Sequence, residues 1–328
     1  MIRWGIVGAG NIAKRFAGSL QYEKDACLYA ISGRNAEKLK AFQSEHPCEK
    51  IYLSHEELTN DQQIDAVYIA LPHDMHAEWS IKALQKKKAV LCEKPASINE
   101  IEVRKMIDAA EMNHTLFMEA MKSRFEPAYI RTAELIGEGT IGQILTIKAQ
   151  IASIFPKEKY AASYLTKPGV GGALLDTGCY CINWLNAYFK GEPEIEILDA
   201  AMHDSVEYYA DAELHFSNGT GEIIAGFDRR AELLAEIIGN KGKIIVEKPH
   251  RPDKIHLVLD GRETVIELPY VHDDFYGQIH HFDALLQEGR TESDVMSFAD
   301  SIRNAHLLDA VKKKLYQSGT ADQRISSI

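Results

Sequence analysis

The chain has 328 residues, of which 45% are hydrophobic and 26% are charged. This composition is typical of a globular protein, and the length allows two domains with a core in each. Acidic residues outnumber lysine and arginine by 48 to 37, which gives a net charge of −11 at pH 7. No basic run is longer than the three residues Lys86-Lys87-Lys88, so neither nucleic acid nor a membrane is expected as a partner.

Cysteine usage and hydrophobic runs indicate where the protein is located. The five cysteines are scattered, without the paired spacing of a zinc site or a disulfide framework, which predicts a reducing, cytoplasmic environment. They are Cys27, Cys48, Cys92, Cys179 and Cys181. No apolar run reaches the length that spans a membrane. Met1–Trp4 lead directly into the first predicted strand, so we expect no signal peptide.

The first predicted strand, Ile2–Val7, is followed at once by a glycine-rich turn and a helical pattern. In this turn Gly8 permits a tight bend, Gly10 lets the backbone approach a pyrophosphate, and the small Ala13 allows close helix packing. The helix N-terminus then offers unpaired N–H groups to phosphate. We therefore predict dinucleotide binding, with a glycine turn that has no ligand as the alternative. The predicted cofactor contacts are Gly8, Ala9, Gly10, Asn11 and Ile12.

The second predicted strand, Ala26–Ser32, ends where the adenosine ribose of the cofactor is expected. An NAD site commonly has an acidic residue there, but this sequence continues with glycine and arginine. Serine and arginine bind a 2′-phosphate, whereas a carboxylate repels it. The predicted cofactor is therefore NADP(H), with NAD(H) as the alternative. The predicted contacts are Ser32, Gly33, Arg34 and Lys38, although Lys38 also fits an ordinary solvated position.

The third predicted strand, Ile64–Leu71, ends in a loop with a proline and two histidines. Because the carboxyl ends of parallel strands line one crevice, this loop faces the same ligand as the glycine turn. The predicted cofactor contacts are Leu71, Pro72, His73 and His76. Two histidines three residues apart also suit a metal ion, but no third ligand lies nearby, so we predict no metal site.

A lysine stands at the end of the next predicted strand, Val90–Cys92, in the sequence Glu93-Lys94-Pro95. Pro95 fixes its own φ and favours extended backbone at Lys94. A lysine held rigidly at a strand end is a candidate for chemistry at the cofactor; the alternative is a solvated lysine. A helix over 99–112 and a strand over 115–118 complete an alternation that predicts a doubly wound parallel sheet in residues 1–121.

In residues 122–328 the pattern changes to strands in series, which predicts an α+β domain with a mostly antiparallel open sheet. Asn218-Gly219 and Asp260-Gly261 are typical of hairpin turns. The predicted strands are Gln143–Ser153, Ile195–His203, Tyr208–Phe216, Thr220–Phe227, Leu233–Gly239, Lys243–Val246, Lys254–Leu259 and Thr264–Leu268. Two further helices are predicted over Phe275–Leu286 and Phe298–Leu315.

A glycine-rich segment over residues 169–180 leads into an apolar helical pattern that continues through Phe189. Asp176 and Tyr180 are four residues apart and therefore share one face of the predicted helix. A carboxylate one turn from a phenol can position it or change its pKa, which is ordinarily about 10. The alternative is a capping aspartate and a core tyrosine.

With these motifs together, the chain resembles the Gfo/Idh/MocA family of glucose–fructose oxidoreductase and inositol dehydrogenase over nearly its whole length. The resemblance rests on residues 8–13, on Glu93-Lys94-Pro95 and on Gly172–Tyr180. It implies a Rossmann domain and a C-terminal domain whose open sheet face mediates a homodimer or a dimer of dimers. It also implies sugar or cyclic polyol substrates, with Lys94 as the catalytic lysine.

The family's acidic residue and base, often histidine, correspond to Asp176 and Tyr180 here. Tyrosine at this position resembles the branch that contains dimeric dihydrodiol dehydrogenase and NADP-dependent xylose dehydrogenase, as do Arg34 and the segment Met118–Pro127. The tyrosine leaves open whether it or Lys94 transfers the proton. The remaining predicted cofactor contacts within these motifs are Glu93, Lys94 and Arg124.

The resulting hypothesis is NADP-dependent hydride transfer to or from a hydroxyl or carbonyl of a sugar, a cyclic polyol or a trans-dihydrodiol. Lys94 would lower the pKa of Tyr180 and stabilise alkoxide charge, while Asp176 would orient the pair. Two alternatives are a non-catalytic NADP-sensing regulatory protein and a redox-assisted glycosidase. The three catalytic candidates argue against the first alternative, and Arg34 argues against the second.

Overall fold

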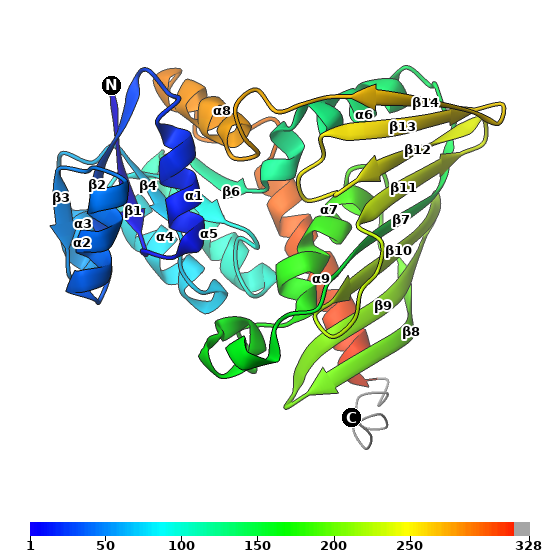
Figure 1. The fold of residues 1–328 in the computed structure, drawn as a ribbon, viewed down its shortest axis with the longest axis horizontal. Coiled ribbons are helices and arrows are strands. Elements are labelled where there is room, and N and C mark those ends of the chain that lie inside the picture. The colour runs from blue at the N-terminus through cyan, green and yellow to red at the C-terminus, as the bar shows by residue number, and fades with distance from the viewer. Residues whose placement is uncertain (318–328) are drawn as a thin grey trace. The chain divides into compact units, whose positions relative to one another are not determined.

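The structure, a computed structural model, describes residues 1–317, which form two compact units. The first unit contains Met1–Phe125 and Val271–Ile302, and the second contains Glu126–Tyr270 and the chain from Arg303. Each unit is built on its own sheet (Figure 1). Within the described residues, no helix is long and apolar enough to cross a membrane.

The first unit contains a six-stranded parallel sheet in the order β3-β2-β1-β4-β5-β6. Its strands are β1 (Ile2–Val7), β2 (Ala26–Ser32), β3 (Lys50–Tyr52), β4 (Ala66–Ile69), β5 (Ala89–Glu93) and β6 (Phe117–Ala120). The order reverses between β1 and β4, which is the switch point of a doubly wound fold. The predicted Rossmann sheet is confirmed, and only the short β3 is missing from the sequence prediction.

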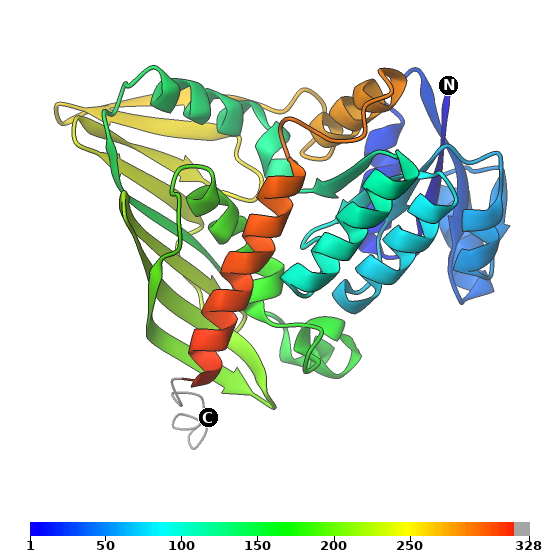
Figure 2. The same cartoon turned by 180° about the vertical axis from the view of Figure 1, so that it is seen from behind.

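Helices cover both faces of this sheet, as buried parallel strands require. They are α1 (Asn11–Leu20), α2 (Ala36–Glu45), α3 (His55–Asn60), α4 (His76–Gln85), α5 (Glu100–Asn113) and α8 (Tyr276–Gln287), with short 3-10 turns at His73–Met75 and Lys122–Phe125. α1 packs against α8, and α4 packs against α5. α1 lies in front of the sheet in Figure 1, whereas α4 and α5 lie in front of it in Figure 2, seen from behind.

The strands β4 and β5 of the first sheet are buried along their whole length. These strands are therefore nearly continuous apolar runs without an alternating pattern. Phe16 of α1 stacks on Tyr68 of β4 with 3.9 Å between ring centroids. This stacking fills the layer between the helix and the sheet.

The segment Val271–Ile302 packs with the first unit, whereas the sequence prediction places it in the second domain. Trp4 of β1 is fully buried, and its Nε1 donates to Oδ1 of Asp283 in α8 at 3.1 Å. The rings of Phe16 and Phe282 each lie 5.1 Å from the Trp4 ring. A buried indole needs an acceptor for its N–H, and here α8 supplies both the acceptor and an aromatic contact.

The second unit contains an eight-stranded sheet in the order β14-β13-β12-β11-β7-β10-β9-β8. Its strands are β7 (Ile144–Ala152), β8 (Glu194–His203), β9 (Val206–Phe216), β10 (Gly219–Gly226), β11 (Leu234–Gly239), β12 (Gly242–Glu247), β13 (Lys254–Leu259) and β14 (Arg262–Glu267). Only β7 and β10 pair in parallel. All eight predicted strands are confirmed, and the sheet is mostly antiparallel as predicted.

Helices of the second unit pack on one face of its sheet. The helical segments are α6 (Pro127–Gly137), short 3-10 turns at Lys157–Ala162 and Tyr164–Thr166, a π-turn at Leu174–Gly178, α7 (Cys179–Asn186) and α9 (Phe298–Gln317), whose residues from Arg303 belong to this unit. Gly221 of β10 admits Leu185 of α7, because a Cβ there would lie 2.3 Å from a Leu185 methyl carbon. Asn304 of α9 accepts a hydrogen bond from Asn186 of α7 at 2.9 Å.

Replacing Trp4 with phenylalanine should lower the free energy of unfolding by about 2–3 kcal/mol, because the smaller ring leaves a void and Asp283 loses its buried donor. Denaturant titration measures the loss. In the double variant Trp4→Phe/Asp283→Leu no buried polar group is left unmatched, so part of the loss should be recovered. A double variant less stable than the single one would contradict this account.

Candidate active site

The carboxyl ends of the parallel strands bring four predicted cofactor segments to one edge of the first sheet. β1 leads into the glycine turn, β2 into Ser32 and Arg34, β4 into the loop from Leu71, and β5 into Lys94. In doubly wound sheets ligands bind outside this edge, where the strand order reverses. The predicted cofactor contacts on these four segments therefore share one edge of the sheet.

The glycine turn has the conformation that a pyrophosphate needs. Gly8 has φ +104°, and a Cβ there would lie 2.3 Å from the carbonyl oxygen of Ala70, so only glycine fits. Gly10 is the extended N-cap residue of α1, and its helix end has no side-chain cap. Unpaired N–H groups at a helix N-terminus bind phosphate, so this turn fits a dinucleotide. Partly or fully exposed residues here are Ala9, Gly10, Asn11 and Ile12.

The four predicted contacts at and after the end of β2 differ in how far they are exposed. Arg34 and Lys38 are exposed and Gly33 is half-buried, whereas Ser32 is fully buried. The Ser32 hydroxyl lies 2.8 Å from Nδ1 of His55, a residue that the sequence analysis does not single out. The exposed guanidinium and ammonium groups are therefore open to an anion, while the serine is turned toward a histidine.

The loop after β4 is tied to the turn after β5 by one imidazole. Leu71 and Pro72 are half-buried, and His73 and His76 are buried. The ring nitrogens of His76 lie 2.8 Å from the carbonyl oxygen of Leu71 and 2.9 Å from that of Pro95. Burial lowers the pKa of His76, so a neutral ring donates to one carbonyl at a time. Direct cofactor contact by His73 and His76 stays a prediction.

Two buried carboxyl groups hold the turn that carries Lys94. Glu93 accepts a hydrogen bond from the Tyr68 hydroxyl and another from the backbone N–H of Lys94 at 3.2 Å. Glu119 of β6 accepts a hydrogen bond from the backbone N–H of Ala96 at 3.1 Å. Burial raises the pKa of Glu93 and raises that of Glu119 to about 7. The backbone on either side of the half-buried Lys94 is thus held by two interior acceptors. The sequence predicts Glu93 only as a cofactor contact and does not single out Glu119.

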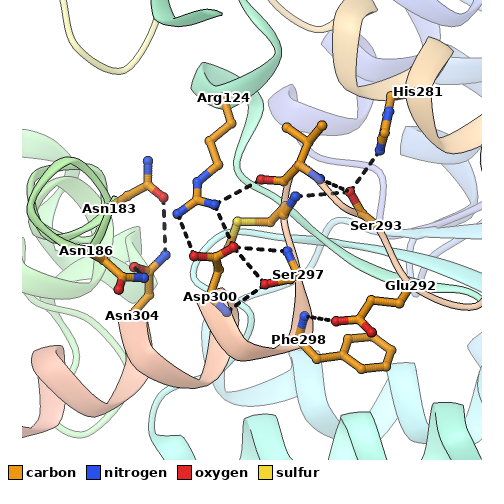
Figure 3. Close-up of polar contacts among 12 residues, drawn as sticks. Arg124, Asn183, Asn186, His281, Glu292, Ser293, Ser297, Phe298, Asp300 and Asn304 are labelled. Carbon is orange, nitrogen blue, oxygen red and sulfur yellow. Dashed lines mark hydrogen bonds and ion pairs between the residues drawn. The ribbon is translucent and has the colours of Figure 1, made fainter. Parts of the chain in front are cut away.

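Arg124, a predicted cofactor contact, is 6% exposed and pairs with Asp300 inside the first unit (Figure 3). Its Nη1 lies 2.9 Å from Oδ2 of Asp300 and donates to the carbonyl oxygen of Val295 at 2.9 Å. Burial would raise the pKa of Asp300, but the charge and hydrogen bonds of Arg124 outweigh it and lower that pKa. The guanidinium is therefore engaged by a carboxylate, and its contact with a cofactor stays a prediction.

In the second unit, Asp176 and Tyr180 lie on a segment that is not a regular α-helix throughout. Leu174–Gly178 forms a π-turn, and α7 begins only at Cys179, so the predicted helix is interrupted at Asp176. Such π-turns are frequent at functional sites. Asp176 is half-buried and Tyr180 is 6% exposed.

The loop after β12 anchors the helix that carries Tyr180. The ring centroid of His250 lies 5.9 Å from that of Tyr180, in an edge-on arrangement. Nε1 of Trp184 donates to the carbonyl oxygen of Pro249 at 3.1 Å. Only the fold brings His250 to Tyr180, because no spacing in the sequence connects them.

A buried glutamate lies beside Gly172, just before the π-turn that contains Asp176. Glu207 of β9 is 1% exposed, and burial raises its pKa. Gly172 has φ +114°, and a Cβ there would lie 2.0 Å from Oε1 of Glu207. The glycine is thus required by its backbone conformation and by the carboxyl group beside it. The glycine is visible in the sequence, but its buried neighbour is not.

Potential metal ligands gather elsewhere. In residues 1–317 one group of three comes together, Glu196, Glu213 and His215 on the second sheet. The rings of His73 and His76 lie 5.7 Å apart, and neither belongs to that group. The two histidines therefore share no third ligand within the part of the chain that the structure describes.

The doubly wound sheet and its glycine turn define a dinucleotide-binding fold, and the second sheet narrows the class further. Residues 2–121 match the description "Oxidoreductase family, NAD-binding Rossmann fold", and residues 129–245 match "GFO/IDH/MocA C-terminal domain". The chain belongs to the GFO/IDH/MocA oxidoreductase family, as its motifs predict.

Curated relatives align with this chain over almost its full length. A trans-1,2-dihydrobenzene-1,2-diol dehydrogenase of Xenopus laevis is 32% identical, covering 95% of this chain and 98% of the relative. The scyllo-inositol 2-dehydrogenase (NADP(+)) IolU of Bacillus subtilis is 28% identical, covering 98% and 100%. Both alignments therefore cover nearly the full length of the relatives.

Solved structures are similar over both units. KijD10, a 3-ketoreductase from Actinomadura kijaniata in complex with NADP and TDP-benzene, has a TM-score of 0.85 at 26% identity, covering 95% of this chain and 97% of the other. Levoglucosan dehydrogenase in complex with NADH and levoglucosan has a TM-score of 0.84 at 20% identity, covering 97% and 98%. The second likeness shows the fold alone.

Replacing Glu119 with glutamine should change how stability depends on pH. Because the pKa of Glu119 in the folded protein is about 7, above its ordinary value, ionisation between about pH 4.5 and pH 7 destabilises the fold. Glutamine keeps an acceptor for the Ala96 N–H and does not ionise. Between about pH 5 and pH 8 the variant should lose about 1–3 kcal/mol less stability than the wild type.

Denaturant titrations at the two pH values measure this difference. Glu111→Gln, at an exposed position on α5, is the matched control and should follow the wild type. Parallel losses in the wild type and in Glu119→Gln would show that the buried carboxyl does not ionise over this range.

Proposed function

We propose that this protein is an NADP(H)-dependent dehydrogenase or reductase that acts on a ring hydroxyl or carbonyl of a sugar, a cyclic polyol or a trans-dihydrodiol. The observation that carries the proposal is the set of residues that come together at the carboxyl-terminal edge of the first sheet. A glycine turn fitted to a pyrophosphate and a lysine on a firmly held turn lie at strand ends of this one edge. A cofactor and a charged group for its chemistry are therefore expected on the same side of the sheet.

The relatives support the substrate class. The enzymes from Xenopus and Bacillus are named for a trans-dihydrodiol and for scyllo-inositol. Both compounds are six-membered carbocycles with hydroxyl groups on neighbouring carbons. We therefore propose a vicinal diol on a six-membered ring, or the corresponding hydroxy-ketone, as the group that reacts.

The proposed mechanism divides the work between the cofactor and three side chains. The nicotinamide, when bound, supplies hydride exchange with the substrate carbon. The Tyr180 phenolate takes the alcohol proton during oxidation, and the resulting phenol returns a proton to the carbonyl oxygen during reduction, while Lys94 donates a hydrogen bond to the same oxygen. A phenol with a pKa of about 10 acts near neutral pH only beside a positive charge. Lys94 would supply that charge, and Asp176 would orient the pair.

NADP(H) is proposed over NAD(H) because of the residues after β2. Arg34 and Lys38 are exposed there, and no carboxylate occupies residues 32–35. A guanidinium binds a 2′-phosphate through paired hydrogen bonds. The names of IolU and of the KijD10 complex, both with NADP, agree with this proposal.

We also propose that the protein forms a homodimer, or a dimer of dimers, through the open face of the second sheet. This face carries a small apolar cluster of Ala152, Tyr209 and Ile224. Beside it, Lys148 and Glu222 pair at 2.6 Å. A cytoplasmic location is proposed because the scattered cysteines show no disulfide spacing.

Lys94→Ala and Tyr180→Phe should each lower kcat by about 10²–10⁴-fold, because each removes a group that stabilises the transition state. The dissociation constant of NADPH should change by less than about threefold, since both variants keep the glycine turn for the pyrophosphate and Arg34 for the 2′-phosphate, which we expect to supply most of the binding. Steady-state kinetics with inositols, aldoses and cyclic trans-diols, together with NADPH fluorescence titration, measure both quantities.

Lys105→Ala and Tyr22→Phe, at exposed positions, are the matched controls and should keep wild-type turnover. Wild-type turnover in Lys94→Ala would refute the catalytic role. Tight NADPH binding with no turnover of any of these substrates by the wild type would favour a sensor. Turnover of glycosides without a net absorbance change of the nicotinamide would favour a redox-assisted glycosidase.

Arg34→Ala should raise the dissociation constant of NADPH by about tenfold or more and leave that of NADH within about twofold, because the guanidinium meets only the 2′-phosphate. Arg34→Asp should go further and favour NADH, since a carboxylate repels the phosphate and accepts the ribose hydroxyl. A wild-type protein that binds NADH as tightly as NADPH would overturn the cofactor assignment.

A further inference from the structure

A histidine that the cofactor motifs do not include lies at the adenosine end of the predicted dinucleotide site. His55 begins α3, directly after Ser54, which caps that helix. Its Nδ1 lies 2.8 Å from Oγ of Ser32, at the carboxyl end of β2. The ring also meets that of Trp79 in an edge-on arrangement, with 5.0 Å between centroids. The imidazole therefore contacts both a strand end and an aromatic ring of α4.

The serine fixes the ring. Ser32 is fully buried, and its Oγ also lies 3.4 Å from the carbonyl oxygen of Ile6. When the hydroxyl donates to this carbonyl, it accepts a hydrogen bond from Nδ1–H of His55; otherwise it donates to an unprotonated Nδ1. In both arrangements the serine hydroxyl forms its hydrogen bonds with groups of the protein itself. Its hydroxyl orients the histidine and is poorly placed to bind a ligand.

The second ring nitrogen is available to a ligand. His55 is half-buried, and within residues 1–317 its only hydrogen bond is through Nδ1. Nε2 is therefore free to donate a hydrogen bond when the imidazole is protonated, or when Nδ1 accepts from Ser32. The fixed ring gives this donor a defined direction, which lowers the entropic cost of binding.

The charges around His55 come from three elements. Burial lowers the pKa of His55, the positive charge of Arg34 before α2 lowers it further, and Glu78 of α4 raises it. Lys82 of α4 pairs with Glu78 at 2.6 Å and lies 3.9 Å from Glu56 of α3. Two cationic groups, Arg34 and protonated His55, therefore oppose each other unless an anion joins them.

We propose that His55 is a specificity-determining residue that binds the adenosine 2′-phosphate of NADP(H) together with Arg34, and that Ser32 is its positioning residue. This inference rests on the NADP(H) preference of the proposed function. It changes the role of Ser32 from a direct phosphate ligand to the group that holds one. An acidic residue at this end of the site would accept a ribose hydroxyl, whereas an imidazole and a guanidinium select the phosphate.

The assignment predicts proton uptake on binding. A phosphate dianion beside His55 favours the imidazolium, so its pKa rises when NADP(H) binds. Affinity for NADPH should therefore increase as the pH falls from about 8.5 to about 6, whereas NADH, which lacks the 2′-phosphate, should show no such dependence. Protonation of the phosphate itself acts in the opposite direction, so the comparison must include a variant without the imidazole.

The experiment measures dissociation constants of NADPH and NADH by fluorescence titration of the full chain at about pH 6, 7.2 and 8.5. His55→Gln should bind NADPH about tenfold more weakly than the wild type at pH 6 and within about twofold at pH 8.5, because a charge-assisted hydrogen bond is lost only where the imidazole is protonated. NADH binding should stay within about twofold of wild type throughout. Ser32→Ala, which releases the ring, should give a smaller loss with the same pH dependence.

His114→Asn is the matched control. His114 is exposed at the C-cap of α5 with φ +50°, a conformation that asparagine tolerates, and its removal should change neither affinity. Equal losses of NADPH and NADH in His55→Gln would indicate a purely structural role and overturn the inference.

Wild-type NADPH affinity in His55→Gln at every pH would overturn the inference as well. If Arg34→Ala abolishes the NADPH preference in that case, the cofactor assignment survives and only the role of His55 is lost. A wild-type chain without NADPH preference would overturn both, while turnover of polyols decides the proposed reaction independently.

Discussion

The turn after β5 depends on hydrogen bonds to carboxyl groups that lie in the interior of the first unit. Glu93 and Glu119 come from adjacent strands and receive backbone N–H groups from either side of Pro95. A buried acceptor is costly to leave unmatched, so the backbone around Lys94 has little freedom. The turn that carries the lysine is therefore held by the sheet itself, and its backbone is as firmly fixed as the strands beside it.

Local patterns in the sequence account for most of the architecture. Continuous apolar runs predict the parallel strands, and Asn-Gly and Asp-Gly pairs predict hairpins of the second sheet. β3 is not predicted because its three residues are all half-buried and too few to show an alternating hydrophobic pattern. The place of α8 could not be predicted, since an amphipathic helix shows which of its faces is buried but not which sheet covers it.

Some residues of the candidate site could likewise be predicted from local sequence patterns, and others could not. The glycine turn, Lys94 and the exposed Arg34 can be found from short motifs because their chemistry is local. His55 and Glu207 contact segments that are distant in the sequence, so no spacing in the sequence identifies them. Ser32 is expected from the sequence to contact the cofactor, but it is fully buried and its hydroxyl lies against His55. A polar residue at a strand end can face either a ligand or its own protein, and the sequence does not distinguish the two.

The first unit combines the N-terminal segment Met1–Phe125 with Val271–Ile302, which follows the second sheet in the chain, and this affects its biosynthesis. The indole of Trp4 finds its acceptor in a residue 279 positions later, after the whole second sheet has been synthesised. Until α8 leaves the ribosome, the nascent nucleotide-binding layer exposes apolar surface that a chaperone can recognise. Ordinary domain-by-domain folding from the N-terminus is therefore interrupted, and a fragment that stops after β6 would lack part of its own core.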